Sequence, residues 1–76
     1  MQNKIKVPQK NRLRELRQDR NLSQWGLAVR SGTSATTVSA IERWGYKPGV
    51  ELQERIATAL GVKIADIWPE VSHEQS

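Results

Sequence analysis

The fold is decided by residues 22–43, LSQWGLAVRSGTSATTVSAIER. Two serines in this stretch, Ser23 and Ser34, can each cap a helix, because a serine hydroxyl accepts a free N–H of the first turn. Gly32 lies between them and can adopt the left-handed conformation that ends many helices. The stretch therefore predicts two short helices joined by a tight turn, over residues 24–30 and 34–43.

Apolar residues are spaced so that each of these helices buries one face. Leu27 and Ala28 are expected to point inward from the first helix, and Val38 and Ile41 from the second. Two short helices joined by a tight turn form a helix-turn-helix, in which the second helix enters the major groove of DNA. The same arrangement occurs in proteins that never bind DNA, so the pattern by itself leaves both alternatives open.

The residues before this stretch predict another helix. Pro8 can occupy the first position of a helix, where its missing N–H is not needed. Leu13 and Leu16 then lie one turn apart on one face, and Asn21 can end the helix in the left-handed conformation. We expect this helix to run from just after Pro8 to about residue 20.

Two more helices are expected after residue 49. The segment 50–60 places apolar residues on one face, and a short helix over 64–68 is stopped by Pro69. The chain is thus expected to be one all-α domain of five helices over residues 9–68. A flexible basic arm, 1–8, precedes this domain, and a polar tail, 69–76, follows it.

Charge is distributed unevenly along the 76 residues. The net charge is +5 over residues 1–20, +2 over 21–48 and −3 over 49–76, which gives +4 for the whole chain. A basic N-terminal part and an acidic C-terminal part favour a polyanionic partner on one side of the protein. A solvated helix surface accounts for such charges equally well.

Several classes of protein are disfavoured by what the sequence lacks. It has no cysteine, no apolar run of about 18 residues and no secretory signal, so we expect a cytoplasmic protein without a membrane partner. The single histidine, His73, lies in the polar tail, and no metal-ligand cluster or phosphate-binding glycine loop is present. We therefore expect neither an enzyme nor a metal or cofactor site.

Residues 22–43 resemble the motif of the Cro and lambda-repressor family, also called the XRE helix-turn-helix family. The matching residues are Leu22, Ser23, Gln24, Leu27, Ala28, Gly32, Ser34, Val38, Ser39, Ile41 and Glu42. LRELR at 13–17, Pro48 and RIATALGV at 55–62 also fit, so the resemblance extends over about residues 9–68. It implies the lambda-repressor-like fold and sequence-specific binding to double-stranded DNA, with Ser34–Arg43 as the recognition helix.

The resemblance also implies roles for individual residues. The side chains expected to face base edges are Ala35, Thr36, Ser39 and Ala40. Those expected near the DNA backbone are Gln24, Ser34 and Thr37. Arg17 and Glu42 fit a structural ion pair that braces the recognition helix.

Basic residues around the motif are candidate phosphate contacts. They are Lys10, Arg14, Arg43 and Lys47. Each can equally be an ordinary surface charge, and the sequence leaves both interpretations open.

The predicted base-facing surface carries only small side chains. It has no Asn, Gln, Arg or Lys, which make bidentate contacts to purine edges. Alanine and threonine methyl groups can pack on thymine methyl groups, and hydroxyls can form single hydrogen bonds. We therefore expect modest discrimination by hydrogen bonding, supported by thymine methyls, water and DNA shape.

The tryptophans are the residues that fit the family pattern least. Trp25 stands where a solvent-facing polar residue is usual, and Trp44 where glycine is usual. Trp44 can lie with Tyr46 against the sugar-phosphate backbone or fold back over the core, and folding back is the favoured interpretation. Trp68 is expected to close the base of the helical bundle.

The resemblance implies a small transcriptional regulator of bacterial, phage or plasmid origin. Such a protein is expected to bind a palindromic operator as a homodimer, with half-sites about one helical turn apart. Repression by occlusion is favoured over activation. The alternative is an antitoxin or another protein-interaction module, which uses the same fold to bind a protein partner.

Overall fold

Five α-helices follow one another along residues 11–69, the part of the chain that the computed structural model describes. They are α1 (Leu13–Asp19), α2 (Gln24–Ser31), α3 (Ala35–Trp44), α4 (Val50–Leu60) and α5 (Ile64–Ile67). No strand occurs in these residues, so the predicted all-α class and order of helices are confirmed. The predicted arm, Lys10 and the tail beyond Pro69 lie outside the described residues.

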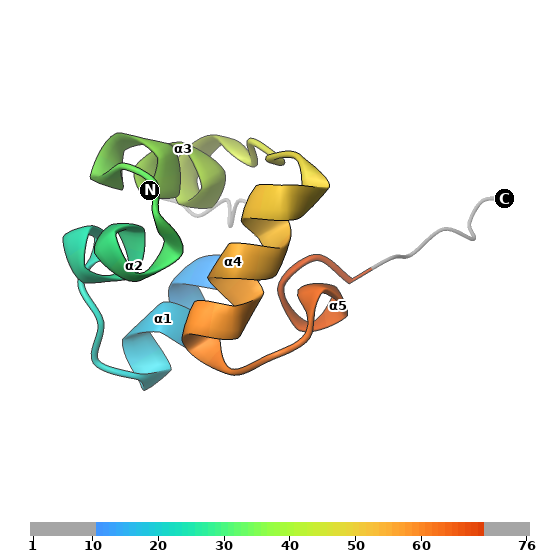
Figure 1. Cartoon of the computed structure of the whole chain (residues 1–76), viewed down its shortest axis with the longest axis horizontal. Helices are drawn as coiled ribbons and strands as arrows, with labels where there is room; N and C mark the ends of the chain where they lie inside the picture. The colour runs from blue at the N-terminus through green and yellow to red at the C-terminus, as the bar shows by residue number, and fades with distance from the viewer. Residues whose placement is uncertain (1–10, 70–76) are drawn as a thin grey trace, which may run out of the picture.

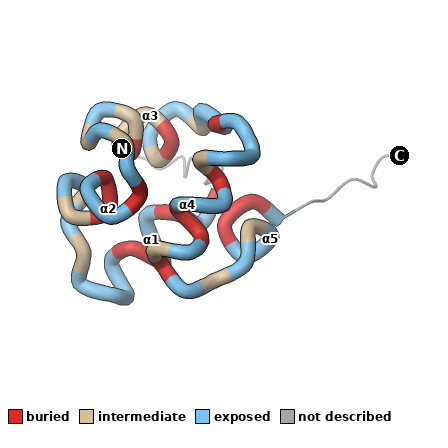
Figure 2. The backbone as a smooth tube through the Cα atoms, viewed as in Figure 1, coloured by how far each residue is buried: buried red, intermediate tan, exposed pale blue. Residues whose placement is uncertain are grey.

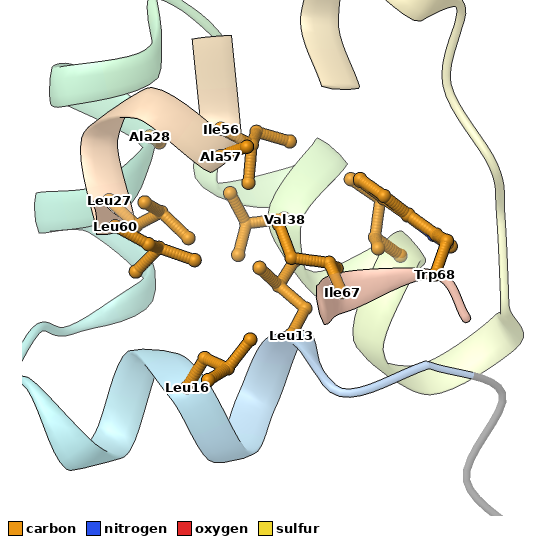
Figure 3. Close-up of a cluster of buried hydrophobic side chains, with 11 residues drawn as sticks. Leu13, Leu16, Leu27, Ala28, Val38, Ile56, Ala57, Leu60, Ile67 and Trp68 are labelled. Carbon is orange, nitrogen blue, oxygen red and sulfur yellow. The ribbon is translucent and has the colours of Figure 1, made fainter. Parts of the chain in front are cut away.

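The helices pack around one apolar core. Helix α2 packs against both α3 and α4, α1 packs on α3, and α5 packs on α4 (Figure 1). Buried positions lie on the helix sides that face the centre (Figure 2). The core side chains are Leu13, Leu16, Leu27, Ala28, Val38, Ile41, Ile56, Ala57, Leu60, Ile67 and Trp68 (Figure 3). No helix of residues 11–69 is long and apolar enough to cross a membrane.

The turn between α2 and α3 forms as the serines and glycine predict. The Ser23 hydroxyl accepts the Gly26 N–H at 2.8 Å, and the Ser34 hydroxyl accepts the Thr37 N–H at 3.1 Å. Gly32 ends α2 with a φ of 73°, a left-handed conformation that glycine adopts without steric penalty. The chain therefore reverses within three residues and starts α3 directly against α2.

The first helix starts later than its sequence pattern predicts. Residues 11 and 12 are not helical, and α1 begins at Leu13. The reason is that the Asn11 side chain accepts the Leu13 N–H at 3.0 Å, while the Arg12 N–H donates to the Ile67 carbonyl at 2.9 Å. Both bonds occupy groups that a longer helix would need. The predicted left-handed end of this helix is confirmed, because Asn21 has a φ of 57°.

The expectation that Trp44 folds back over the core is wrong. The indole of Trp44 is 75% exposed, and the core is closed by other side chains. The aromatic residue of the core is Trp68. It is 6% exposed and packs beside Ile67 (Figure 3). The predicted role of Trp68 is thus confirmed, and Trp44 is left on the surface at the end of α3.

Candidate nucleic-acid interface

The outer face of α3 gathers the four side chains that were predicted to meet base edges. Together with Gln24 of α2 and Trp44, they line an open hollow of ≈ 370 Å³, which we call the recognition hollow. Its lining residues are Gln24, Ala35, Thr36, Ser39, Ala40 and Trp44. Because alanine, serine and threonine have short side chains, this face projects little from the backbone of α3, and we call it the low face. A DNA double helix can approach the backbone of α3 closely there.

The start of α3 carries a pair of hydroxyl groups. The Ser34 and Thr37 hydroxyls lie 3.0 Å apart and form one hydrogen bond, in which either can be the donor. The hydroxyl that is not donating in this bond still has a hydrogen for another acceptor. The predicted backbone contacts Ser34 and Thr37 are therefore adjacent, and both lie at the N-terminal end of the helix.

Gln24 is positioned by a hydrogen bond to Glu42, the acidic member of the predicted ion pair. Its Nε2 donates to Glu42 Oε1 at 3.1 Å. An amide nitrogen has two hydrogens, so one remains for an acceptor outside the protein. The first N–H groups of a helix have no partner within it, and the Ser23 hydroxyl takes only that of Gly26. Gln24 thus presents donors from both its side chain and its backbone at the edge of the recognition hollow.

Arg17 and Glu42 form the ion pair that the family resemblance implied. Arg17 Nε lies 2.7 Å from Glu42 Oε2, and Arg17 Nη2 donates to Glu42 Oε1 at 3.0 Å. Arg17 also donates from Nη1 to the Leu22 carbonyl at 2.8 Å. The hydrogen bond to Glu42 raises the pKa of the Arg17 guanidinium above its ordinary value, although burial opposes this. Arg17 therefore stays charged, and its bonds to Glu42 tie α1 to the end of α3.

A second hollow adjoins the first and is lined by basic residues. It has a volume of ≈ 740 Å³, and we call it the arginine hollow. Its lining residues are Arg14, Arg17, Gln24, Ser39, Glu42, Arg43 and Trp44. The guanidinium groups of Arg14 and Arg43 have no hydrogen-bond or ion-pair partner among residues 11–69, so their charge is available to an anion.

Lys47 is placed differently from the two arginines. It lies in the loop between α3 and α4, is exposed, and lines neither hollow. The structure therefore brings Arg14 and Arg43 to the face of α3 but does not bring Lys47 there. Lys10 is outside the described residues.

Three residues that position this surface were missed by the sequence analysis. Asn11 donates from Nδ2 to the Ile41 carbonyl at 3.0 Å and so fixes the last turn of α3 to the start of α1. Arg55 donates to the Ser31 carbonyl at 2.9 Å, just before the turn, and Arg20 donates to the Leu60 carbonyl at 2.6 Å. An asparagine two residues before a helix is a recognisable signal for a cap. The two arginines give no such signal, because their carbonyl partners are distant in sequence.

Comparison with known proteins identifies the family of the chain. Residues 11–67 match the family model described as a helix-turn-helix domain. The chain belongs to the helix-turn-helix family. Among its relatives are an HTH-type transcriptional regulator of Methanocaldococcus jannaschii, 44% identical, and the regulator YgzD of Bacillus subtilis, 36% identical. Each alignment spans 59 residues, which are 78% of this chain and 89% of the relative.

Solved structures give the same family. The restriction-modification controller protein C.AhdI of Aeromonas hydrophila matches with a TM-score of 0.68 and 36% identity, over 72% of this chain and 83% of that one. The hypothetical transcription factor NHTF from Neisseria matches with a TM-score of 0.67 and 34% identity, over 75% and 66%. The resemblance to Cro and lambda-type regulators is thus confirmed, and this helix-turn-helix protein is a DNA-binding transcriptional regulator.

Proposed function

We propose that this regulator places α3 in the major groove of an operator and represses transcription by occluding it. The observation that carries the proposal is the recognition hollow, where Ala35, Thr36, Ser39 and Ala40 form one low face on α3. This face lies beside Arg14 and Arg43, two arginines that have no partner within residues 11–69. A helix face of short side chains, flanked by available positive charge, is suited to binding a DNA duplex.

The contacts to the DNA backbone are assigned to the residues around this face. Gln24, Ser34 and Thr37 have hydrogen-bond donors at the N-terminal ends of α2 and α3, where free N–H groups also attract phosphate. Arg14 and Arg43 supply charge from the arginine hollow. Lys47 in the following loop and Lys10 before α1 are further phosphate contacts in this proposal.

Sequence is read through small groups. Thr36 and Ser39 can each form single hydrogen bonds to bases, and the methyl groups of Ala35, Ala40 and Thr36 can contact thymine methyls. Single contacts discriminate less than bidentate ones do. We therefore propose a site in which A·T pairs and local DNA shape contribute most of the selectivity.

The assembly and setting follow from the same proposal. Two copies bind as a homodimer to half-sites about one helical turn apart, because one low face of α3 covers only a few base pairs. The protein acts by occupying DNA, without catalysis and without a cofactor. We place it in the cytoplasm of a prokaryotic host, where operator DNA is accessible.

Two substitutions that each introduce one negative charge test the proposal. Thr36→Glu adds a carboxylate to the recognition hollow, and Thr58→Glu adds one to an exposed threonine of α4, outside that hollow. We expect Thr36→Glu to weaken binding to duplex DNA by at least about tenfold in fluorescence anisotropy, because a carboxylate is repelled by phosphate. Thr58→Glu should bind nearly as wild type does. Equal affinities for the two variants would show that α3 does not face DNA.

A further inference from the structure

Trp44 is the most exposed large apolar residue of the described chain, and it lies on the functional face. Its indole is 75% exposed at the last position of α3. It lines both the recognition hollow and the arginine hollow, together with Gln24 and Ser39. A large exposed apolar side chain at the junction of two hollows is a mark of a contact surface.

The position of Trp44 along α3 decides which part of a duplex it can reach. Thr36, Ala40 and Trp44 are four residues apart and so share one side of the helix. Eight residues advance a helix by about 12 Å, which is about the width of the major groove. Where the axis of α3 crosses the groove with Thr36 over base edges, Trp44 lies near the strand that borders the groove.

The charge beside Trp44 indicates what covers it. Arg14 and Arg43 line the arginine hollow with the indole, and neither has a partner among residues 11–69. A hollow lined by an indole and two available guanidinium groups suits an occupant that is both anionic and partly apolar. The sugar-phosphate backbone of DNA has both properties, because deoxyribose presents carbon atoms between the phosphates.

The end of α3 holds the backbone of Trp44 in a defined conformation. Gly45 follows Trp44 with a φ of 74°, and the N–H groups of Gly45 and Tyr46 both donate to the Ala40 carbonyl. The Ile41 carbonyl, in the same turn, accepts the Asn11 side chain at 3.0 Å. The backbone that carries Trp44 is thus fixed before DNA arrives, so contact does not require this turn to become ordered.

We propose that Trp44 is a DNA contact of this chain, packing its indole against the sugar-phosphate backbone at the edge of the groove. The inference rests on the proposed placement of α3 in the major groove. The indole is much larger than the other side chains of the recognition hollow. Its contact with the DNA backbone therefore fixes how deeply α3 enters the groove and over which base pairs it lies. The indole N–H is a donor that can reach a phosphate oxygen of the same strand.

The test compares two exposed tryptophans. Trp25 is 70% exposed on α2 and lines neither hollow, so it is the matched control for Trp44. The probe is the tightest-binding duplex recovered from a random DNA pool by the wild-type chain. We expect Trp44→Ala to weaken binding about tenfold, as for other aromatic contacts to nucleic acid, and Trp25→Ala to stay within about twofold.

Fluorescence supplies a measurement that is independent of affinity. In Trp25→Phe, Trp44 is the single exposed tryptophan of residues 11–69, and saturating duplex is expected to reduce its quenching by acrylamide by about half. In Trp44→Phe, the quenching of Trp25 should change little. Circular dichroism confirms that every variant is folded.

The outcomes separate this inference from the proposed function. Failure to recover any duplex overturns both. Bound duplex that leaves either the acrylamide quenching of Trp44 or the affinity of Trp44→Ala unchanged overturns the inference, while the proposed function stands. Protection of Trp44 that appears without DNA and rises with protein concentration also overturns it, because a second copy then covers the indole.

Discussion

The Arg17 guanidinium meets the Glu42 carboxylate through two hydrogen bonds, of 2.7 and 3.0 Å, and so joins α1 to the C-terminal part of α3. Glu42 also accepts a hydrogen bond from Gln24, so one carboxylate of α3 binds side chains from two other helices, α1 and α2. A carboxylate near a helix C-terminus is otherwise unfavourable, because the helix dipole is negative there. Its presence at this place is explained by its two partners.

Loss of Glu42 should therefore be costly. We expect Glu42→Ala to lower the free energy of unfolding by about 3 kcal/mol in urea denaturation, because Arg17 is left charged and largely buried. The double variant Arg17→Met/Glu42→Leu should recover most of this loss, since no charge then remains without a partner. A single variant as stable as wild type would show that the pair does not brace α3.

The asparagine before α1 should also matter for stability. Asn11 is buried and uses its side chain as donor to Ile41 and as acceptor from Leu13. We expect Asn11→Ala to lower the free energy of unfolding by about 2 kcal/mol, because two buried groups lose their partner. Arg12→Ala, at the neighbouring exposed position, should leave the denaturation midpoint nearly unchanged. Equal effects at the two positions would contradict the role assigned to Asn11.

Arg14 and Arg43, the two arginines of the arginine hollow that have no partner among residues 11–69, should each contribute to the salt dependence of DNA binding. Each is expected to reduce the slope of log K against log salt by about one unit when changed to alanine, because one fewer phosphate is neutralised. Arg30→Ala is the control, since Arg30 is exposed on α2 but lines neither hollow. A titration series from low to moderate salt measures the slopes, and an equal decrease for Arg30→Ala would remove the distinction.

Ser31 and Ser23, at the two ends of α2, should respond to substitution in opposite directions. Ser31 is buried, and its hydroxyl has no hydrogen-bond partner in the described part of the chain, so Ser31→Ala should raise the free energy of unfolding by about 1 kcal/mol. Ser23 caps α2, so Ser23→Ala should lower it by about 1 kcal/mol. For a domain of this size each change corresponds to a shift in Tm of roughly 4–8 °C. Thermal unfolding that moved in the same direction for both variants would contradict this assignment.

Helices bounded by local signals were predictable from the sequence. Ser23, Gly32 and Ser34 act within one or two turns of their own positions, so their effect on α2 and α3 can be recognised without knowing the fold. The pairing of Arg17 with Glu42 came from the family resemblance, because nothing local links residues that are 25 positions apart.

The features that were missed depend on tertiary contacts. Asn11 donates to the Ile41 carbonyl, 30 residues away, and the Arg12 N–H donates to the Ile67 carbonyl, which helps to delay the start of the first helix. The favoured interpretation had Trp44 folding back over the core to extend a small hydrophobic cluster. Its spacing of four residues from Ala40 places it on the outer side of α3 instead, while Trp68 fills the core.

Selection of bound sequences from a random duplex pool tests the central claim most directly. The account places the small side chains of α3 against base edges, in two copies related by a twofold axis. It predicts an inverted repeat with half-site centres about one helical turn apart and A·T pairs enriched at the contacted positions. Recovery of sites dominated by G·C pairs at those positions, or no enrichment over the starting pool, would contradict it.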